Sequence, residues 1–142
     1  MHPNMTGILI AVVVSFFLGW LWYGPLFGKA WAKELGISMD QKPPAGVMIK
    51  GMVIMVIGCF LTAWVLASDG MAWRMVPGMG MGEASVVKFG FMGGFFTWLG
   101  FYLPQHLSRL AWENKSMKLF WINALHSFIM LILVGIIVAN WH

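Results

Sequence analysis

Apolar residues fill four long runs of the chain, and shorter segments between these runs hold most of the charged residues. Each run is close to the roughly 20 residues that an α-helix needs to cross the hydrocarbon core of a bilayer. The pattern therefore predicts an all-α membrane protein with four transmembrane helices, forming a single domain over residues 1–142. The predicted spans cover residues 7–23, 46–67, 84–103 and 119–139.

The segment after the first run has a helical pattern of its own. Pro25 is predicted to end the first membrane helix, because proline cannot donate a backbone hydrogen bond. Phe27, Trp31 and Leu35 then recur every fourth residue, which places them on one helix face. Gly36 follows as a C-terminal cap. We expect a short amphipathic helix that lies in the membrane interface.

Composition agrees with a membrane protein, since 60% of the 142 residues are hydrophobic and only 10% are charged. A soluble domain carries roughly 25% charged residues. The net charge of +4 does not indicate nucleic-acid binding, because the nine basic residues are scattered singly. Cys59 is the one cysteine and lies in an apolar run, so the sequence holds no disulfide framework and no cysteine-based zinc motif.

The distribution of basic residues predicts the orientation in the membrane. Seven of the nine lie in or beside the connections 24–45 and 104–118. The positive-inside rule then places both connections in the cytoplasm and both termini on the outer, periplasmic side. Aromatic and proline residues at this boundary are expected at the interface, as in an aromatic belt: Trp22, Tyr23, Pro25 and Trp31.

Part of the sequence recurs after the third run. Aligning Phe16 with Phe95 without a gap gives six identities in nineteen positions, and Tyr23-x-Pro25 falls on Tyr102-x-Pro104. Shared apolar composition would produce some of these matches by chance. A true duplication would make two parallel helical hairpins related by a pseudo-twofold axis along the membrane normal, each followed by an interfacial segment.

One block of the chain resembles a known family. The block is Trp22-Tyr23-Gly24-Pro25-Leu26-Phe27-Gly28, followed much later by Trp98-Leu99-Gly100-Phe101 and by Ile122-Asn123. These motifs resemble a bacterial family of small integral membrane proteins that is catalogued as a domain of unknown function. The resemblance implies a four-helix protein of the bacterial cytoplasmic membrane, and it supplies no catalytic residues.

Small residues recur at every fourth position on several predicted helices. Such stripes let helix backbones approach closely in lipid, where van der Waals packing replaces the hydrophobic effect. The pattern predicts helix packing, either within one chain or between chains. The stripes comprise Gly7, Ala11, Ser15 and Gly19 on the first helix, Cys59, Ala63 and Ala67 on the second, and Gly90 and Gly94 on the third.

Polar side chains are expected to gather at the cytoplasmic end of the bundle. His106 and Glu113 follow the third run, and Asn123 and His126 share a face of the fourth helix. Ionisable groups within a membrane indicate a functional site, such as a proton relay or a metal site. The alternative is that these groups only form hydrogen bonds between helices, since no metal-binding sequence motif accompanies them.

The outer loop contains Met71, Met75, Met79 and Met81. Thioether sulfur is a soft ligand that selects Cu(I), so the loop is a candidate copper site. The chain holds 13 methionines, however, and clusters of this kind are expected from that number alone. Methionine also forms adaptable packing surfaces.

No enzyme motif occurs in the sequence, and five acidic residues leave few candidates for acid/base chemistry. We expect a non-enzymatic structural or accessory subunit of a larger membrane complex, in contact with the bilayer and with other subunits or further copies of itself. The alternative is a small transporter or channel for protons or metal ions, built on the two repeated hairpins with His106, Asn123 and His126 on its path. The sequence identifies no cofactor, and bound lipid stays open.

Overall fold

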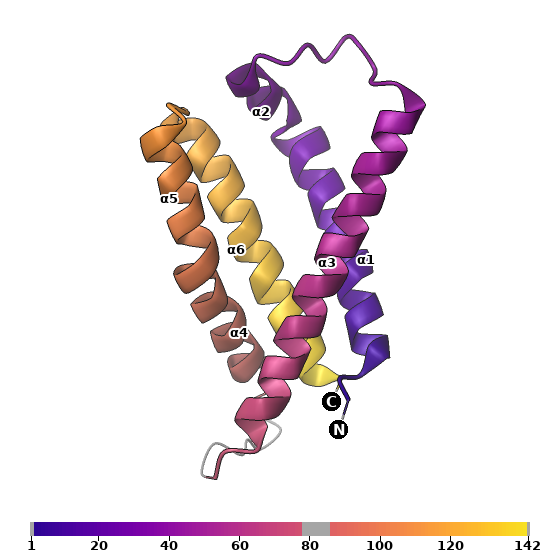
Figure 1. Cartoon of the computed structure of the whole chain (residues 1–142), viewed down its shortest axis with the longest axis vertical. Helices are drawn as coiled ribbons and strands as arrows, with labels where there is room; N and C mark the ends of the chain where they lie inside the picture. The colour runs from indigo at the N-terminus through magenta and orange to yellow at the C-terminus, as the bar shows by residue number, and fades with distance from the viewer. Residues whose placement is uncertain (1, 78–85, 142) are drawn as a thin grey trace.

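The computed structural model describes residues 2–77 and 86–141, and the described chain is helical throughout its length apart from short connections. Met79 and Met81 of the candidate copper loop lie outside these residues. The elements, in chain order, are α1 (Met5–Leu21), η1 (Trp22–Leu26), α2 (Gly28–Leu35), α3 (Ala45–Arg74), α4 (Val86–Thr97), η3 (Trp98–Tyr102), α5 (Leu103–Trp112) and α6 (Met117–Asn140), where η marks a π-helical segment (Figure 1).

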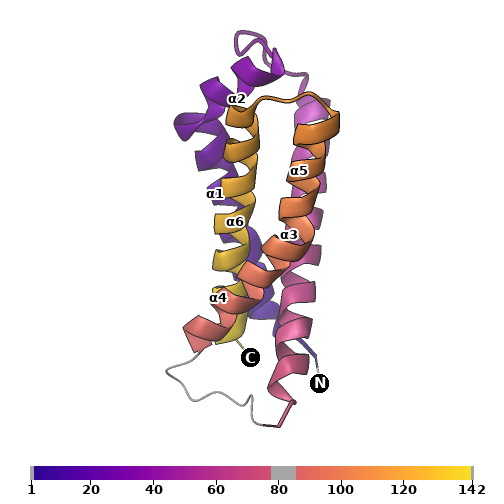
Figure 2. The same cartoon turned by 90° about the vertical axis from the view of Figure 1, so that its left-hand side faces the viewer.

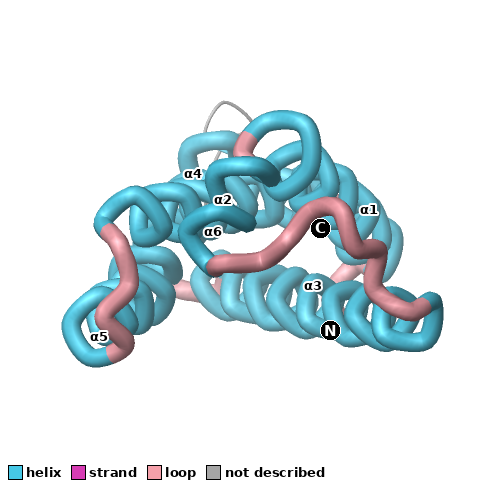
Figure 3. Tube along the Cα trace, turned by 90° about the horizontal axis from the view of Figure 1, so that it is seen from above, coloured by secondary structure: helices cyan, strands magenta, loops and turns pink. Residues whose placement is uncertain are grey.

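Four stretches of the described chain are long and apolar enough to cross a membrane, which confirms the predicted fold class. They cover Met5–Leu26, Ala45–Arg74, Val86–Trp112 and Met117–Asn140. Both termini lie at one end of the molecule, which we call the terminal end (Figure 1). The connections 36–44 and 113–116 lie at the opposite end, which we call the connection end (Figure 2). Figure 3 shows the 36–44 connection running over this end from α2 to the start of α3.

Two predicted helix ends differ from the structure. The first helical stretch passes through Pro25 as a π-helical segment and ends one residue later, at Leu26. Proline has no backbone N–H group, and the local π geometry tolerates the hydrogen bond that is missing at Pro25. The second difference concerns residues 104–118, which were predicted to be a connection. Most of them form α5, with Pro104 in its first turn, where a missing N–H group costs little.

The short helix predicted after the first span is present as α2. It ends at Gly36, whose φ of 69° is in the left-handed region that glycine adopts without strain. The two halves of the chain also share an arrangement, since η1 precedes α2 and η3 precedes α5. Trp22 and Trp98 open these π segments 76 residues apart, whereas the sequence alignment of Phe16 with Phe95 has an offset of 79. The duplication stays a prediction.

The apolar core lies in the terminal half of the bundle, where α1, α3 and α6 pack together. Its buried residues are Ile8, Ala11, Ala63, Leu66, Ala67, Leu131, Val134 and Val138. By contrast, every residue of α3 from 45 to 58 is exposed on the isolated chain. The bundle is therefore closed at its terminal end and open at its connection end.

Small residues mark the closest helix contacts, and these contacts lie within one chain. Gly7, Ala11, Ser15 and Gly19 are the small buried residues of α1, and Gly90 and Gly94 are buried on α4. A methyl group at Gly94 would collide with the backbone of Leu131 on α6. A methyl group at Gly135 of α6 would likewise collide with the backbone of Gly90, although Gly135 was not among the predicted packing residues.

Candidate functional site

A cleft of about 770 Å³ opens between the helices at the connection end. Its volume is within the range of roughly 300–1,000 Å³ that is typical of small-molecule sites. The polar and charged side chains on its walls are Tyr23, Tyr102, His106, Arg109, Glu113, Lys115, Asn123, His126 and Ser127. The remaining walls are aromatic, aliphatic and methionine side chains from α1, α2, α3, α5 and α6.

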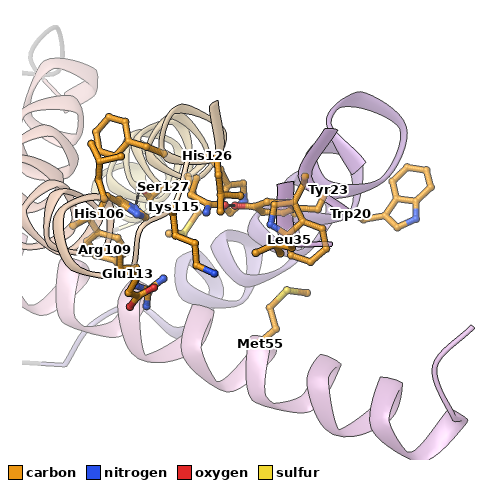
Figure 4. Close-up of a pocket in the computed structure, with 18 of the residues that line it drawn as sticks. Trp20, Tyr23, Leu35, Met55, His106, Arg109, Glu113, Lys115, His126 and Ser127 are labelled. Carbon is orange, nitrogen blue, oxygen red and sulfur yellow. Dashed lines mark hydrogen bonds between the residues drawn. The ribbon is translucent and has the colours of Figure 1, made fainter. Parts of the chain in front are cut away.

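The four residues of the predicted polar cluster all line this cleft. His106 and Glu113 come from α5 and its C-terminal cap, and His126 comes from α6 (Figure 4). Asn123 lies one turn earlier on α6. The structure thus brings together side chains that are up to 20 positions apart in the sequence.

The π segment η1 attaches α1 to α6 through two consecutive aromatic residues. Trp22 donates from its indole Nε1 to the carbonyl oxygen of Ile122 at 2.9 Å. Tyr23 donates from its hydroxyl group to Asn123 Oδ1 at 2.7 Å. Trp22 is only 8% exposed, so it lies inside the protein, and its depth at the membrane interface stays a prediction. Tyr23 faces the cleft, whereas Pro25 is exposed.

A second tryptophan attaches the other π segment to the same helix. Trp98, at the start of η3, lies with its indole Nε1 3.0 Å from the carbonyl oxygen of Ala124 and 3.1 Å from Ser127 Oγ. Ser127 Oγ donates to Ala124 O at 2.9 Å and lies 3.0 Å from His106 Nε2. This network holds the His106 ring at the cleft wall.

His126 differs from the other polar groups because its Nε2 atom is buried and has no hydrogen-bond partner within the described part of the chain. Its ring packs against Tyr23 at 4.9 Å and against Trp22 at 6.0 Å between ring centroids. Trp31, another residue predicted at the interface, packs edge-on against Tyr23 and lines the cleft. A buried polar atom without a partner is uncommon and calls for an explanation, of which an ordered water molecule is one.

Three charged groups lie toward the connection end of the cleft. Arg109 and Glu113 project from the α5 side, and Lys115 lies between them and Tyr23 (Figure 4). Among the described residues, no ion pair or side-chain hydrogen bond joins these three groups. Arg109 and Lys115 were predicted to be topology signals and were not assigned to a site.

A spacing pattern in the sequence could have identified them. The cleft-lining residues of η3 and α5 are Tyr102, His106, Arg109, Leu110 and Glu113, which form one helical stripe. The stripe has the spacing i, i+4, i+7, i+8 and i+11 of a single helix face. It went unrecognised because residues 104–118 were expected to be a connection without a continuous face.

No three histidine, cysteine, aspartate or glutamate side chains gather to hold a metal ion anywhere in residues 2–77 and 86–141. Met71 lies on α3 and Met75 is its C-terminal cap, while the other two methionines of the candidate copper loop are outside these residues. The copper hypothesis therefore stays a prediction.

Fold and cleft together define a multi-pass helical membrane protein with a polar cleft at one end of its bundle. More particularly, the chain belongs to the family described as "Protein of unknown function (DUF1761)", which matches residues 6–139. This assignment confirms the resemblance to a family of unknown function. No curated protein and no solved structure matches the chain.

Proposed function

We propose that this protein is a small transporter or channel in which a solute enters the membrane through the cleft at the connection end. The observation that carries the proposal is the open cleft of about 770 Å³, whose wall includes His126, a ring whose own Nε2 atom is buried and lacks a partner in the described chain. Nearby, His106 and Asn123 supply further hydrogen-bonding groups on the same cleft wall. Polar side chains inside membrane proteins characteristically face pathways or cavities.

The packing of the bundle supports the same proposal. The terminal half is closed by the apolar core, whereas the connection half is held by hydrogen bonds from Trp22, Tyr23 and Trp98 to α6. A solute entering the cleft would thus be stopped at the core until the helices move. This arrangement suits a carrier that opens to one side at a time.

A second candidate is the accessory subunit expected from composition. It is favoured by the first half of α3, where residues 45–58 are all exposed on the isolated chain. Gly46, Gly51 and Gly58 each leave open space where a side chain would be. Glycine on a membrane helix suits close contact with another helix. Such a subunit would need no water in the cleft, and this difference allows a test.

The test compares two positions on α3 at nearly the same depth. Met55 lines the cleft, whereas Val53 is exposed but does not line it. Met55 is ten residues after Ala45, which is about 15 Å along the helix axis at 1.5 Å per residue. Each position is changed to cysteine in a Cys59→Ala background, and the purified protein is reconstituted in phosphatidylcholine vesicles and treated with a membrane-impermeant thiol reagent.

We expect Met55→Cys to react with the reagent and Val53→Cys to remain unlabelled, because only the first residue would contact water in the cleft. Labelling in denaturing detergent controls for the amount of each protein. Equal protection of both positions in the membrane would contradict the transporter proposal and favour a dry accessory subunit.

A further inference from the structure

The order of side chains along the cleft identifies a class of ligand. The charged groups Arg109, Glu113 and Lys115 lie toward the connection end. Asn123 and His126 follow at a deeper level on α6. Apolar side chains then extend the wall, and the deepest of them on α6 is Met130. All three charged groups thus lie toward the mouth of the cleft, where Leu119 and Phe120 add apolar surface, and the deeper wall combines polar side chains with apolar ones.

The charged level favours an anion. Arg109 and Lys115 outnumber Glu113, so the fixed charges sum to +1. Arginine presents planar N–H donors that fit phosphate and carboxylate oxygens, and lysine adds a point charge. The charged side chains make no ion pair with one another within the described residues, so the two cations keep their donors for a ligand.

The deeper levels favour a ligand with an ester or hydroxyl group followed by a hydrocarbon chain. Asn123 Oδ1 accepts a hydrogen bond from the Tyr23 hydroxyl group. The amide nitrogen of Asn123 has no partner in the described chain and can donate a hydrogen bond to a ligand. Met52, Met55 and Met130 provide flexible thioether surfaces that adapt to an irregular chain. On α6 the wall from Asn123 to Met130 is about 10 Å long at 1.5 Å per residue.

We propose that the cleft binds a single-chain anionic amphiphile, with its head between Arg109 and Lys115 and its chain along the methionines. The proposal rests on the proposed function and names the solute class of that site. A lipid in one leaflet of a bilayer presents the same groups in the same order along the membrane normal, namely an anionic head, an ester and a hydrocarbon chain. A ligand of this class could enter from the membrane without crossing the headgroup region.

Native mass spectrometry of the full chain in a neutral detergent tests the proposal with three matched probes. The probes are 1-oleoyl-lysophosphatidate, monoolein with the same chain and no phosphate, and glycerol 3-phosphate with the same head and no chain. We expect one lysophosphatidate per chain, with the other two probes at the background level. Equal binding of monoolein would show that the head is not recognised, and equal binding of glycerol 3-phosphate would identify a free-anion site. Either result would overturn the proposal.

Charge variants locate the head. Arg109→Gln is expected to weaken lysophosphatidate binding about tenfold, since hydrogen bonds to charged groups are the stronger kind. Glu113→Gln is expected to strengthen binding, because it removes the negative charge beside the head. Lys42→Gln is the matched control, because it removes one positive charge from the 36–44 connection, outside the cleft. Equal losses in Arg109→Gln and Lys42→Gln would assign the binding to overall charge and contradict the site.

The labelling experiment and the binding experiment distinguish a failure of the transporter proposal from a failure of the ligand proposal. If Met55→Cys reacts with the thiol reagent but lysophosphatidate does not bind, the ligand class is wrong and the transporter proposal stands. If Met55→Cys is protected while lysophosphatidate binds in an Arg109-dependent way, the transporter proposal falls and the chain is a lipid-binding membrane protein.

Discussion

The contact between α4 and α6 allows a prediction from two adjacent glycines. A methyl group added at Gly94 would lie 2.7 Å from the carbonyl carbon of Leu131 and 3.0 Å from Cα of Ile132. Both atoms belong to the backbone of α6, so the helices must separate to admit it. A methyl group added at Gly93 would meet no atom within 4 Å. The two residues therefore differ in packing while sharing the same helix.

Overpacking of a well-packed interior typically costs about 1–3 kcal/mol. We take the upper end for Gly94→Ala, because a backbone cannot rotate away as a side chain can. Replacing glycine by alanine within a helix contributes about 1 kcal/mol in the opposite direction. The expected net loss for Gly94→Ala is therefore about 2 kcal/mol, whereas Gly93→Ala is expected to gain up to about 1 kcal/mol. The helix-propensity contribution cancels between the two variants, which leaves a difference of about 3 kcal/mol from packing alone.

Reversible unfolding in mixed micelles, titrated with sodium dodecyl sulfate and followed by circular dichroism, measures this difference. Each variant is compared with the unmodified chain at the same detergent composition. If Gly93→Ala and Gly94→Ala changed the free energy of unfolding equally, the close contact between α4 and α6 would be refuted.

Two further predictions concern the attachments to α6. Arg74 donates to the carbonyl oxygen of Ala139 at 2.6 Å and lies 5.5 Å from the Phe89 ring centroid, so Arg74→Met should lower the unfolding free energy by about 2 kcal/mol in the same assay. Lys88→Met is its control, since Lys88 is exposed, and an equal loss in both variants would contradict a specific role for Arg74. Tyr23→Phe should cost about 1 kcal/mol in the unmodified chain and little in an Asn123→Ala background. Fully additive effects in this double-mutant cycle would show that the bond between Tyr23 and Asn123 does not stabilise the protein.

Sequence reasoning predicted the four spans because hydrophobic length is a property of each segment taken alone. The end of the chain's first helical stretch was less predictable, because Pro25 can either end a helix or pass through a π turn. The π segment places Trp22 and Tyr23 so that they bond to α6, a helix about 100 residues later. No local pattern around Pro25 contains that information.

The amino-acid sequence by itself determined the helical class, the amphipathic α2 with its Gly36 cap, and the small-residue faces of α1 and α4. These features depend on residue type and spacing within one segment. Tertiary structure decided that Trp22 is buried, that Arg109 and Lys115 share a cleft with His126, and that the bundle is closed at one end and open at the other. The physical reason is that a cleft is the space left between helices, and its shape depends on how far they diverge rather than on any one of them.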